Sequence, residues 1–345
     1  MAIGGVDGAA SELDVVRREY ESSLSWRVTR PLRALGRGAR ALRPAPPAAE
    51  PRLPPPPGRY DAWLDAPRLA AIDAACAGGG PEDLARFRPL ETDLWALLLT
   101  QEYSVHPHIR ALLPDVPDPA LQELFNGASG ARLAAQSAAF YDRVRERFGR
   151  PLEDARVLDF GCGWGRLLRF FARDVAPGRL CGCDPVQGIL DVCRDTRVPA
   201  DLRRSAFMPD TLPFDEPFDL AYAFSVFTHL SERAAERCLA ALHAALVPGG
   251  TLVLTVRPLE YLRFDAAMHP LLAAHADRLH EPLHLFAPHP PDPAHPQFDG
   301  GEMTYGEAVV TPAQVRERWS RWFELEHTDV LIGDLYQVVL TLHAI

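Results

Sequence analysis

Three glycines spaced two residues apart follow a short apolar run and an acid. Residues 157–166 read VLDFGCGWGR, with Gly161, Gly163 and Gly165 after Asp159. The apolar start predicts a strand that is buried on both faces, with Asp159 at its carboxyl end. Glycine at every second position lets the backbone approach a ligand where a Cβ atom would clash. The stretch therefore predicts a strand, a tight turn and a helix that together hold a ligand.

A second acidic residue lies at the end of the next expected strand, where it could bind a ribose. A short apolar strand, 180–183, ends at Asp184, which comes about 20 residues after the glycine turn. In doubly wound sheets an acid at this place accepts hydrogen bonds from ribose hydroxyls. Asp184 could instead serve as the cap of the helix expected from Pro185 onward, and the two roles are compatible.

The glycine spacing separates two kinds of cofactor. A dinucleotide fingerprint reads G-x-G-x-x-G, whereas the third glycine here comes one residue earlier. With the acid before it, the stretch resembles motif I of the class I S-adenosylmethionine (SAM) dependent methyltransferases. The segment 214–225, FDEPFDLAYAFS, and the turn 247–250, VPGG, with a strand expected at 251–256, resemble later landmarks of that family. A nicotinamide enzyme is the weakest alternative.

This resemblance implies an α/β fold. It has the Rossmann-like, seven-stranded sheet of class I methyltransferases, a terminal antiparallel hairpin and a helical region before the sheet. Strands expected at 323–330 and 335–344, around a turn at Gly333-Asp334, fit that ending, as does a helix over 313–322. Helical segments are expected before the sheet at 69–76, 84–87, 92–102, 119–125 and 131–148.

The chain divides into four parts on these grounds. They are a basic amphipathic segment at 1–43, a proline-rich linker at 44–58, a helical lead-in at 59–119 and a SAM-dependent methyltransferase domain at 120–345, with an insertion or lid at 258–310. The turn at 126–130, NGASG, precedes the last helix expected before the sheet, and we expect it to close over SAM.

The resemblance makes SAM the cofactor and indicates which residues hold it. The expected contacts are Asp159, Gly161, Gly163, Gly165, Asp184, Pro185, Ala206, Phe207 and Ser225. Many relatives have an acid followed by alanine after the third strand, whereas this chain reads SAFMPD at 205–210. We therefore expect backbone groups of Ala206 and Phe207 to meet the adenine, while the side chain of Phe207 or Met208 packs on the ring.

His229 is the candidate catalytic base. It ends the segment SVFTH at 225–229, after the fourth strand, at the edge where doubly wound folds bind ligands. The sulfonium already makes the methyl group electrophilic, so the protein must align the acceptor and remove the proton of a hydroxyl acceptor. An imidazole of ordinary pKa, about 6.5, accepts that proton at cellular pH. The alternative role is to cap a helix or to pack against the cofactor.

The long segment 257–310 carries six of the twelve histidines. They are His269, His275, His280, His284, His289 and His295. The segment lacks clustered carboxylates, and we expect no metal site. Long insertions at the ligand edge of a sheet form lids or acceptor pockets, so Arg257, Glu260, Tyr305 and Glu307 are candidate contacts of a sugar.

The amino-terminal region suggests a surface and an acceptor. Residues 26–43 contain no acid, and their arginines recur at helical spacing opposite an apolar stripe, which suits an anionic membrane surface. A solvated tail or a helix that docks on a partner is the alternative. The stretch 23–33, SLSWRVTRPLR, resembles a segment of bacterial glycosyltransferases and methyltransferases of cell-surface polysaccharide (O-antigen or capsule) assembly, as does 60–64. This second resemblance implies a glycan acceptor.

Composition excludes several classes of protein. The net charge of −10 argues against a general nucleic-acid binder. The six cysteines lack the spacing of a disulfide framework and are expected to be reduced. No signal peptide is visible, and no apolar run reaches the roughly 18 residues of a membrane helix. We expect a cytoplasmic protein, with peripheral contact to the inner face of the membrane as an added alternative.

Three functions remain open. The leading one is SAM-dependent O-methylation of a sugar hydroxyl on a cell-surface glycan or its precursor. The second is methylation of a soluble natural product or nucleotide sugar. The third is a non-catalytic SAM-fold scaffold in a glycan-assembly complex, against which the intact glycines and Asp184 argue.

Overall fold

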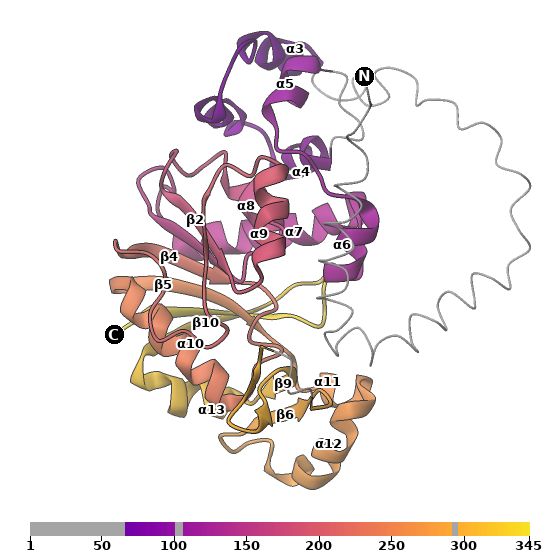
Figure 1. The fold of residues 1–345 in the computed structure, drawn as a ribbon, viewed down its shortest axis with the longest axis vertical. Coiled ribbons are helices and arrows are strands. Elements are labelled where there is room, and N and C mark those ends of the chain that lie inside the picture. Colours follow the sequence, from indigo (N-terminus) through magenta and orange to yellow (C-terminus); the bar gives the residue numbers. More distant parts are fainter. Residues whose placement is uncertain (1–65, 101–105, 292–295) are drawn as a thin grey trace, which may run out of the picture.

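The computed structural model describes residues 66–100, 106–291 and 296–345. A seven-stranded sheet lies at the centre, with the helical lead-in at one end of the molecule and residues 257–310 at the other (Figure 1). The expected basic segment, the linker and the 23–33 and 60–64 stretches lie outside the described residues. In the described part of the chain, no helix is long and apolar enough to cross a membrane.

The sheet confirms the expected Rossmann-like α/β fold with a terminal antiparallel hairpin. Its strands are β1 (Val157–Phe160), β2 (Leu180–Asp184), β3 (Asp201–Arg204), β4 (Phe218–Ala223), β5 (Leu246–Val256), β10 (Phe323–Val330) and β11 (Val338–Ala344). The order across the sheet is β10-β11-β5-β4-β1-β2-β3. Strands β1 to β5 pair in parallel, and β11 is antiparallel to both β5 and β10. Because β4, β1 and β2 are neighbours, their carboxyl ends meet on one edge.

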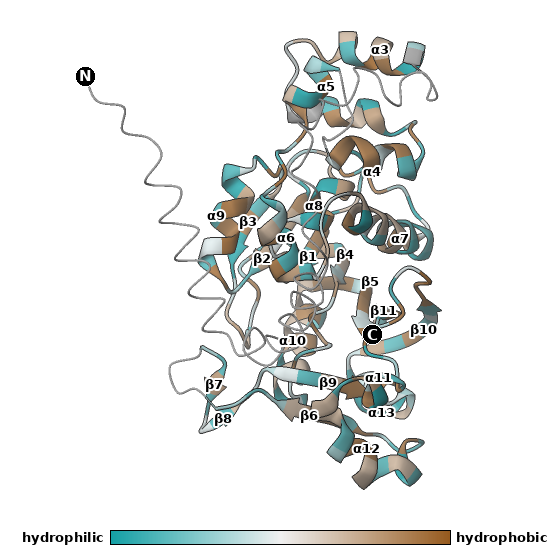
Figure 2. Ribbon diagram, turned by 90° about the vertical axis from the view of Figure 1, so that its right-hand side faces the viewer, coloured by the Kyte–Doolittle hydropathy of each residue, from teal (hydrophilic) through white to brown (hydrophobic). Residues whose placement is uncertain are grey.

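Successive residues of the strands face opposite layers of helices. Val157 packs in the core under α7 (Gly130–Phe148), α8 (Arg166–Phe171) and α9 (Gln187–Asp195). Leu158 faces the core under α10 (Glu232–Ala245) and α13 (Pro312–Arg318), which continues as the 3₁₀ helix η4 (Trp319–Arg321). A parallel strand covered on both faces needs apolar residues throughout, which explains the unbroken apolar runs. In Figure 2, α7 carries both hydrophilic and hydrophobic residues, as a helix with one buried face does.

The lead-in is helical, as expected. Its elements are α3 (Ala66–Ala75), η1 (Pro81–Phe87), α4 (Thr92–Thr100), α5 (Pro107–Leu112) and α6 (Pro119–Asn126). The segment α5 is not predicted from the sequence, because six residues are too short to show an apolar repeat. The end of the helix expected over 92–102 lies outside the described residues.

Two strands begin at other residues than the sequence predicts. Strand β5 begins at Leu246 instead of Thr251, because Leu246 already pairs with Phe218 before the chain bulges out at 247–250. Strand β11 begins at Val338, since the expected turn at Gly333-Asp334 is part of a longer loop.

Residues 257–310 form a small layer of their own at the ligand edge of the sheet. Their elements are α11 (Tyr261–Phe264), η2 (Ala266–Met268), α12 (His269–His275), η3 (Ala276–Arg278), β6 (His284–Pro288), β7 (Phe298–Asp299), β8 (Glu302–Met303) and β9 (Gly306–Val310). Backbone bonds attach β9 to the chain after β4: Gly306 N–H donates to the His229 carbonyl and Ala308 N–H to the Thr228 carbonyl, both at 2.9 Å. We call this attachment the β9 seam.

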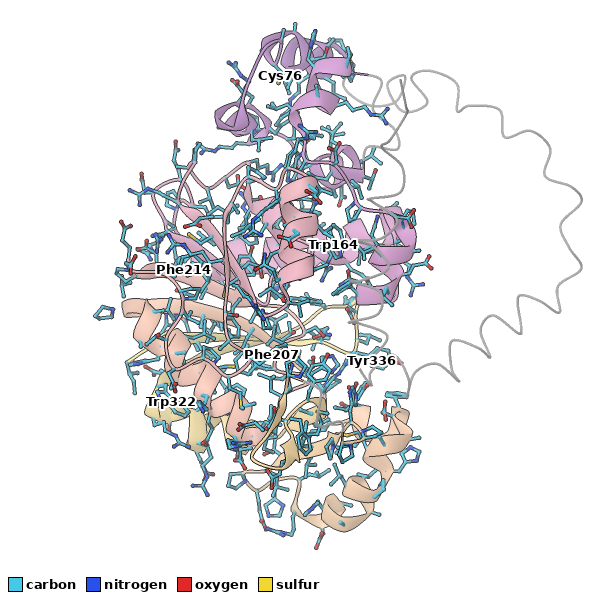
Figure 3. All side chains as sticks on the ribbon, viewed as in Figure 1. Cys76, Trp164, Phe207, Phe214, Trp322 and Tyr336 are labelled. Carbon is cyan, nitrogen blue, oxygen red and sulfur yellow. The ribbon has the colours of Figure 1, made fainter. Side chains whose placement is uncertain are left out.

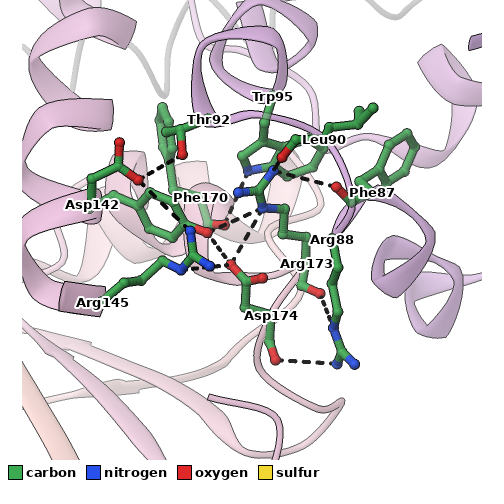
Figure 4. A network of polar contacts seen from close by, with 11 residues as sticks. Phe87, Arg88, Leu90, Thr92, Trp95, Asp142, Arg145, Phe170, Arg173 and Asp174 are labelled. Atoms are coloured by element: carbon green, nitrogen blue, oxygen red, sulfur yellow. Dashed lines mark hydrogen bonds and ion pairs between the residues drawn. The ribbon is translucent and has the colours of Figure 1, made fainter. Parts of the chain in front are cut away.

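The lead-in is fixed to the sheet domain by a buried arginine (Figure 4). Arg173 is 1% exposed, and its Nη1 donates to the carbonyls of Phe87 at 3.4 Å and Leu90 at 2.9 Å. Its Nε donates to the hydroxyl of Tyr141 at 3.2 Å and lies 3.4 Å from the carboxylate of Asp174. One buried charge therefore joins the end of η1, α7 and the segment after α8.

Replacing Arg173 by alanine should reduce the free energy of unfolding by about 3–5 kcal/mol, because the buried carboxylate of Asp174 would lose its nearest cation and the carbonyl of Leu90 would lose its side-chain donor. Urea denaturation measures this loss. Arg179→Ala is the matched control, because Arg179 also donates to a carbonyl, that of Asp154, but is exposed. Equal losses in the two variants would contradict the assignment.

Candidate functional site

The glycine turn after β1 is open on one side. Gly161, Gly163 and Gly165 have φ angles of 76°, 52° and 75°, in the left-handed region that favours glycine. A Cβ atom at Gly161 would lie 2.5 Å from Val226 Cγ2, and one at Gly165 would lie 3.0 Å from Val198 Cγ2. A Cβ atom at Gly163 would meet nothing within 4 Å. Gly163 therefore forms the open side of the cradle, and the other two glycines permit close packing behind it.

Asp184 connects this turn to the end of β2. Its Oδ2 accepts from the Gly163 N–H at 3.0 Å, and its Oδ1 accepts from the Val186 N–H at 2.9 Å. Burial raises the pKa of Asp184 to about 6, although these two backbone bonds lower it. Asp184 thus joins the glycine turn to the start of the segment after β2, while its contact with a ribose stays a prediction. The neighbouring Pro185 follows it directly on the same edge.

Asp159 is buried under the turn. It is 2% exposed, and the buried hydroxyl of Tyr222 interacts with its carboxyl and lowers its pKa, although Oδ2 has no partner at full hydrogen-bond geometry in the described part of the chain. Burial raises the pKa of Asp159 to about 8, against the opposing charge of Arg166. A buried carboxylate oxygen without a donor suits a cationic group of a ligand.

The adenine segment lies next to Asp184. The Ser205 N–H donates to the Asp184 carbonyl at 3.2 Å, which brings Ala206 and Phe207 to the same edge. Phe207 is half-buried, and its carbonyl accepts from the Cys238 thiol of α10 at 3.9 Å. Figure 3 shows Phe207 toward the insertion and Trp164 of the glycine turn near α6. Met208 packs into the core under α10, so Phe207 is the better candidate for ring contact.

Ser225 occupies a strained backbone position at the end of β4. Its φ is 59°, which costs about 1–3 kcal/mol for a residue with a side chain. Its N–H donates to Thr255 Oγ1 at 2.7 Å, and its Oγ accepts from Gln337 Nε2 at 3.2 Å. The Oε1 of Gln337 is buried and has no partner among the described residues. Gln337 belongs to no sequence motif and lies 112 positions from Ser225. The one signal for Thr255 is a polar residue near the end of a mostly apolar strand.

Part of the lead-in covers the glycine turn. Trp164 Nε1 donates to Asn126 Oδ1 at 2.9 Å, and Trp164 packs with Leu121 of α6 and Ile189 of α9. The turn at 126–130, expected to close over SAM, is thus attached to the cradle by one of its own side chains.

His229 lies at the β9 seam with its ring fixed on one side. Its Nδ1 is 2.9 Å from the Gly306 carbonyl and 3.4 Å from Glu307 Oε1, and the ring stacks on Tyr305 at 5.3 Å. Glu307 Oε2 accepts from Tyr261 Oη at 2.9 Å and from Arg257 Nη2 at 3.3 Å. Of the candidate sugar contacts, the structure therefore brings Arg257, Tyr305 and Glu307 to His229, a grouping that sequence spacing did not indicate.

Burial acts against the negative charge of Glu307, but the charges of His229 and Arg257 and the hydroxyl of Tyr261 overcome it. Together they lower the pKa of Glu307 to about 2. The carboxylate is therefore ionised at all physiological pH values, although the side chain of Glu307 is only 14% exposed.

The histidines of the insertion serve other contacts. His280 and His284 do have the H-x₃-H spacing of a zinc pair. His284 Nε2, however, lies 2.9 Å from the Leu230 carbonyl. Across 66–100, 106–291 and 296–345, no group of three or more histidine, cysteine or acidic residues could hold a metal ion. All six cysteines are buried and free.

Comparison with known proteins finds a similarity over these residues. Residues 157–250 match the family model described as "Methyltransferase domain". Over this stretch the chain is similar to a methyltransferase domain. The match runs from the first residue of β1 to the Pro-Gly-Gly turn, and so spans the glycine cradle, Asp184 and His229.

Individual relatives are distant. A trans-aconitate 2-methyltransferase of Variovorax paradoxus (strain S110) is 28% identical over 126 residues, covering 34% of this chain and 48% of the relative. The chain thus spans about half the length of that curated relative. The glycopeptide N-methyltransferase MtfA with sinefungin is similar at 17% identity and a TM-score of 0.41, covering 59% of this chain and 92% of that one. A SAM-dependent methyltransferase from Mesorhizobium loti is similar at 18% identity and a TM-score of 0.40, with coverages of 59% and 97%.

The residues of the edge fit SAM. Gly163 leaves the cradle open to a ligand, and Asp184 stands at its rim with lone pairs for ribose hydroxyls. The unpartnered oxygen of Asp159 suits the cationic end of the methionine portion. Ser225 and the Ala206 to Phe207 segment flank these groups.

Gly163→Ala should weaken SAM binding at least about tenfold, since the added methyl group would enter the open side of the cradle. Isothermal titration calorimetry measures the affinity. Gly178→Ala is the control: Gly178 has φ of 81° and equally open surroundings, but lies before β2, at the opposite edge of the sheet. Both variants should lose similar stability, and only the first should lose affinity. An unchanged affinity in Gly163→Ala would refute the cradle.

The ligand-free protein should lose stability as pH rises between about 5 and 8. The pKa of Asp159 is raised in the folded state, so its stabilising contribution is complete below the ordinary value and is lost toward a pH of about 8. Asp159→Asn does not ionise, and its free energy of unfolding should fall less steeply, by at least about 1 kcal/mol over this range. Urea denaturation at several pH values tests this. Asp154→Asn, which removes an exposed carboxyl, should follow the unmodified protein.

Proposed function

We propose that the protein methylates a sugar hydroxyl of a cell-surface glycan or its precursor, with His229 as the base. One observation carries this proposal: Nδ1 of His229 faces a carbonyl, which can only accept a hydrogen bond. The proton of the neutral ring therefore resides on Nδ1, and the lone pair is on Nε2. This nitrogen has no hydrogen-bond partner in the described part of the chain and can receive the proton of an acceptor.

Bound at this edge, the cofactor would supply an electrophilic methyl group. Asp184 and the glycine turn would hold its ribose and methionine portion, Asp159 would meet its ammonium, and Ala206 and Phe207 would meet its adenine. His229 takes the hydroxyl proton on Nε2 and later releases it to water.

The presence of a base favours a hydroxyl acceptor over a carboxylate. A carboxylate such as trans-aconitate, for which the curated relative is named, is already ionised at neutral pH and needs no base. An acid acceptor would instead need a cation, and Arg257 is engaged with Glu307 and lies over the ring of Tyr261 at 4.3 Å. The site is thus better suited to a neutral oxygen nucleophile.

The glycan part of the proposal rests on the sequence. The stretch 23–33 resembles a segment of polysaccharide-assembly enzymes, and the arginines of 26–43 suit an anionic surface. We place the enzyme in the cytoplasm, where its acceptor would be a lipid-linked precursor at the inner face of the membrane.

Labelled-methyl SAM supplied with lipid-linked glycan of the source organism should transfer label to that fraction. Parallel reactions contain soluble nucleotide sugars or trans-aconitate. His229→Ala should reduce labelling about 100-fold or more, because a hydroxyl acceptor would lose its base. Calorimetry on the same variant should show intact SAM binding.

The outcomes separate the alternatives. Label in the soluble sugars alone would sink the glycan acceptor, and label in trans-aconitate alone would sink the hydroxyl acceptor. Near-normal turnover in His229→Ala would remove its catalytic role. If the unmodified protein does not bind SAM, only the third alternative, a non-catalytic scaffold, would remain.

A further inference from the structure

The partner of His229 is a carboxylate that does not touch the glycine cradle. Glu307 comes from β9, 78 positions after His229 in the sequence, and reaches the ring only because the β9 seam aligns the two segments. Its Oε1 lies 3.4 Å from Nδ1, an ion-pair distance, while the carbonyl of Gly306 accepts the shorter bond at 2.9 Å. The two acceptors lie on the same side of the ring.

We infer that Glu307 is a positioning residue for His229, holding the ring with Nε2 toward the acceptor and stabilising the imidazolium that forms there, while Arg257 limits this stabilisation. The inference rests on the proposed base and adds a mechanism for tuning it. In this arrangement Glu307 favours protonation of the His229 ring and Arg257 disfavours it.

The opposing effects of Glu307 and Arg257 follow from the contacts of the two carboxylate oxygens. Oε1 faces His229, whereas Oε2 accepts from Arg257 Nη2 at 3.3 Å and from Tyr261 Oη at 2.9 Å. A buried carboxylate favours the charged form of a neighbouring imidazole, and a cation on the same carboxylate weakens that effect. Arg257 therefore acts against Glu307 in their effect on the His229 ring.

Other charged or titratable groups around the ring are farther away. Tyr305 lies against one face of the His229 ring, and His289 contacts the edge of Tyr305 at 5.2 Å between centroids. On the α11 side, Asp265 lies 3.3 Å from Tyr261 Oη. These groups reach His229 through a tyrosine, whereas Glu307 faces it directly.

The step itself balances. The acceptor O–H bond breaks, its proton joins the lone pair of Nε2, and the freed electron pair of oxygen forms the new bond to carbon. The ring becomes a cation 3.4 Å from an anion that is already ionised. No proton moves to Glu307, whose lowered pKa of about 2 keeps it a carboxylate throughout.

Nuclear magnetic resonance of the full chain labelled with ¹⁵N-histidine tests this without knowledge of the acceptor. The His229 signals are assigned by their loss in His229→Gln. The neutral ring should carry its proton on Nδ1. The midpoint of the His229 titration should move to lower pH by about 1 unit in Glu307→Gln and to higher pH in Arg257→Gln.

Matched controls remove a charge from the exposed surface of the same insertion. Glu302→Gln and Arg263→Gln lie on β8 and α11, and both side chains are exposed. Neither should move the midpoint measurably. A merely structural role for Glu307 and Arg257 would shift the midpoint in the same direction in both variants, or not at all, and either result would overturn the inference.

Kinetics with the acceptor found by labelling provides the second readout. Glu307→Gln should lower kcat about 10- to 100-fold with little change in KM, and the acidic limb of its pH–rate profile should move to lower pH. Glu307→Asp should recover part of kcat. Unchanged kcat in Glu307→Gln would overturn the inference. If the unmodified protein binds no SAM, the proposed function fails while the magnetic resonance result still decides whether Glu307 and Arg257 act in opposition.

Discussion

The parallel pairing of β4, β1 and β2 is the constraint on which the site depends. It brings three chain segments to one edge, and the bond from the Gly163 N–H to the Asp184 carboxylate fixes the first two in relative position. A glycine turn without this bond would be free to adopt many conformations, because glycine has the largest backbone entropy to lose. The acid at the end of β2 therefore orders the glycine turn.

The elements around the sheet are also held in place by specific hydrogen bonds. The lead-in is held through Arg173 and through the Trp164 to Asn126 bond, and the insertion is held through the β9 seam. Each attachment uses backbone carbonyls or a buried charge, groups that are costly to leave without a partner. The segments that cover the donor and acceptor sides of the edge are thereby made part of the same cooperative structure as the sheet.

Much of the donor side follows from the sequence because its signals are local. The spacing of Gly161, Gly163 and Gly165 predicts a turn. The apolar run that ends in Asp184 predicts a strand with a polar residue at its carboxyl end. Strand β10 and the helices of the lead-in follow from periodicity for the same reason. The bulge before β5 does not, since only pairing with β4 decides that Leu246 belongs to the strand.

The residues around His229 cannot be predicted from local sequence patterns, because long-range contacts bring them together. Glu307 and Arg257 are ordinary charged residues in sequence, and their meaning comes from a contact that β9 makes with the chain after β4. The side chain of Glu307 is 14% exposed, and a carboxylate this buried needs compensation, which Arg257 and the hydroxyl of Tyr261 supply. The position of Glu307 also couples the insertion to the core: if β9 moved away from the seam, His229 would lose the anion that faces its Nδ1. The position of the insertion and the charge beside His229 thus depend on the same contacts.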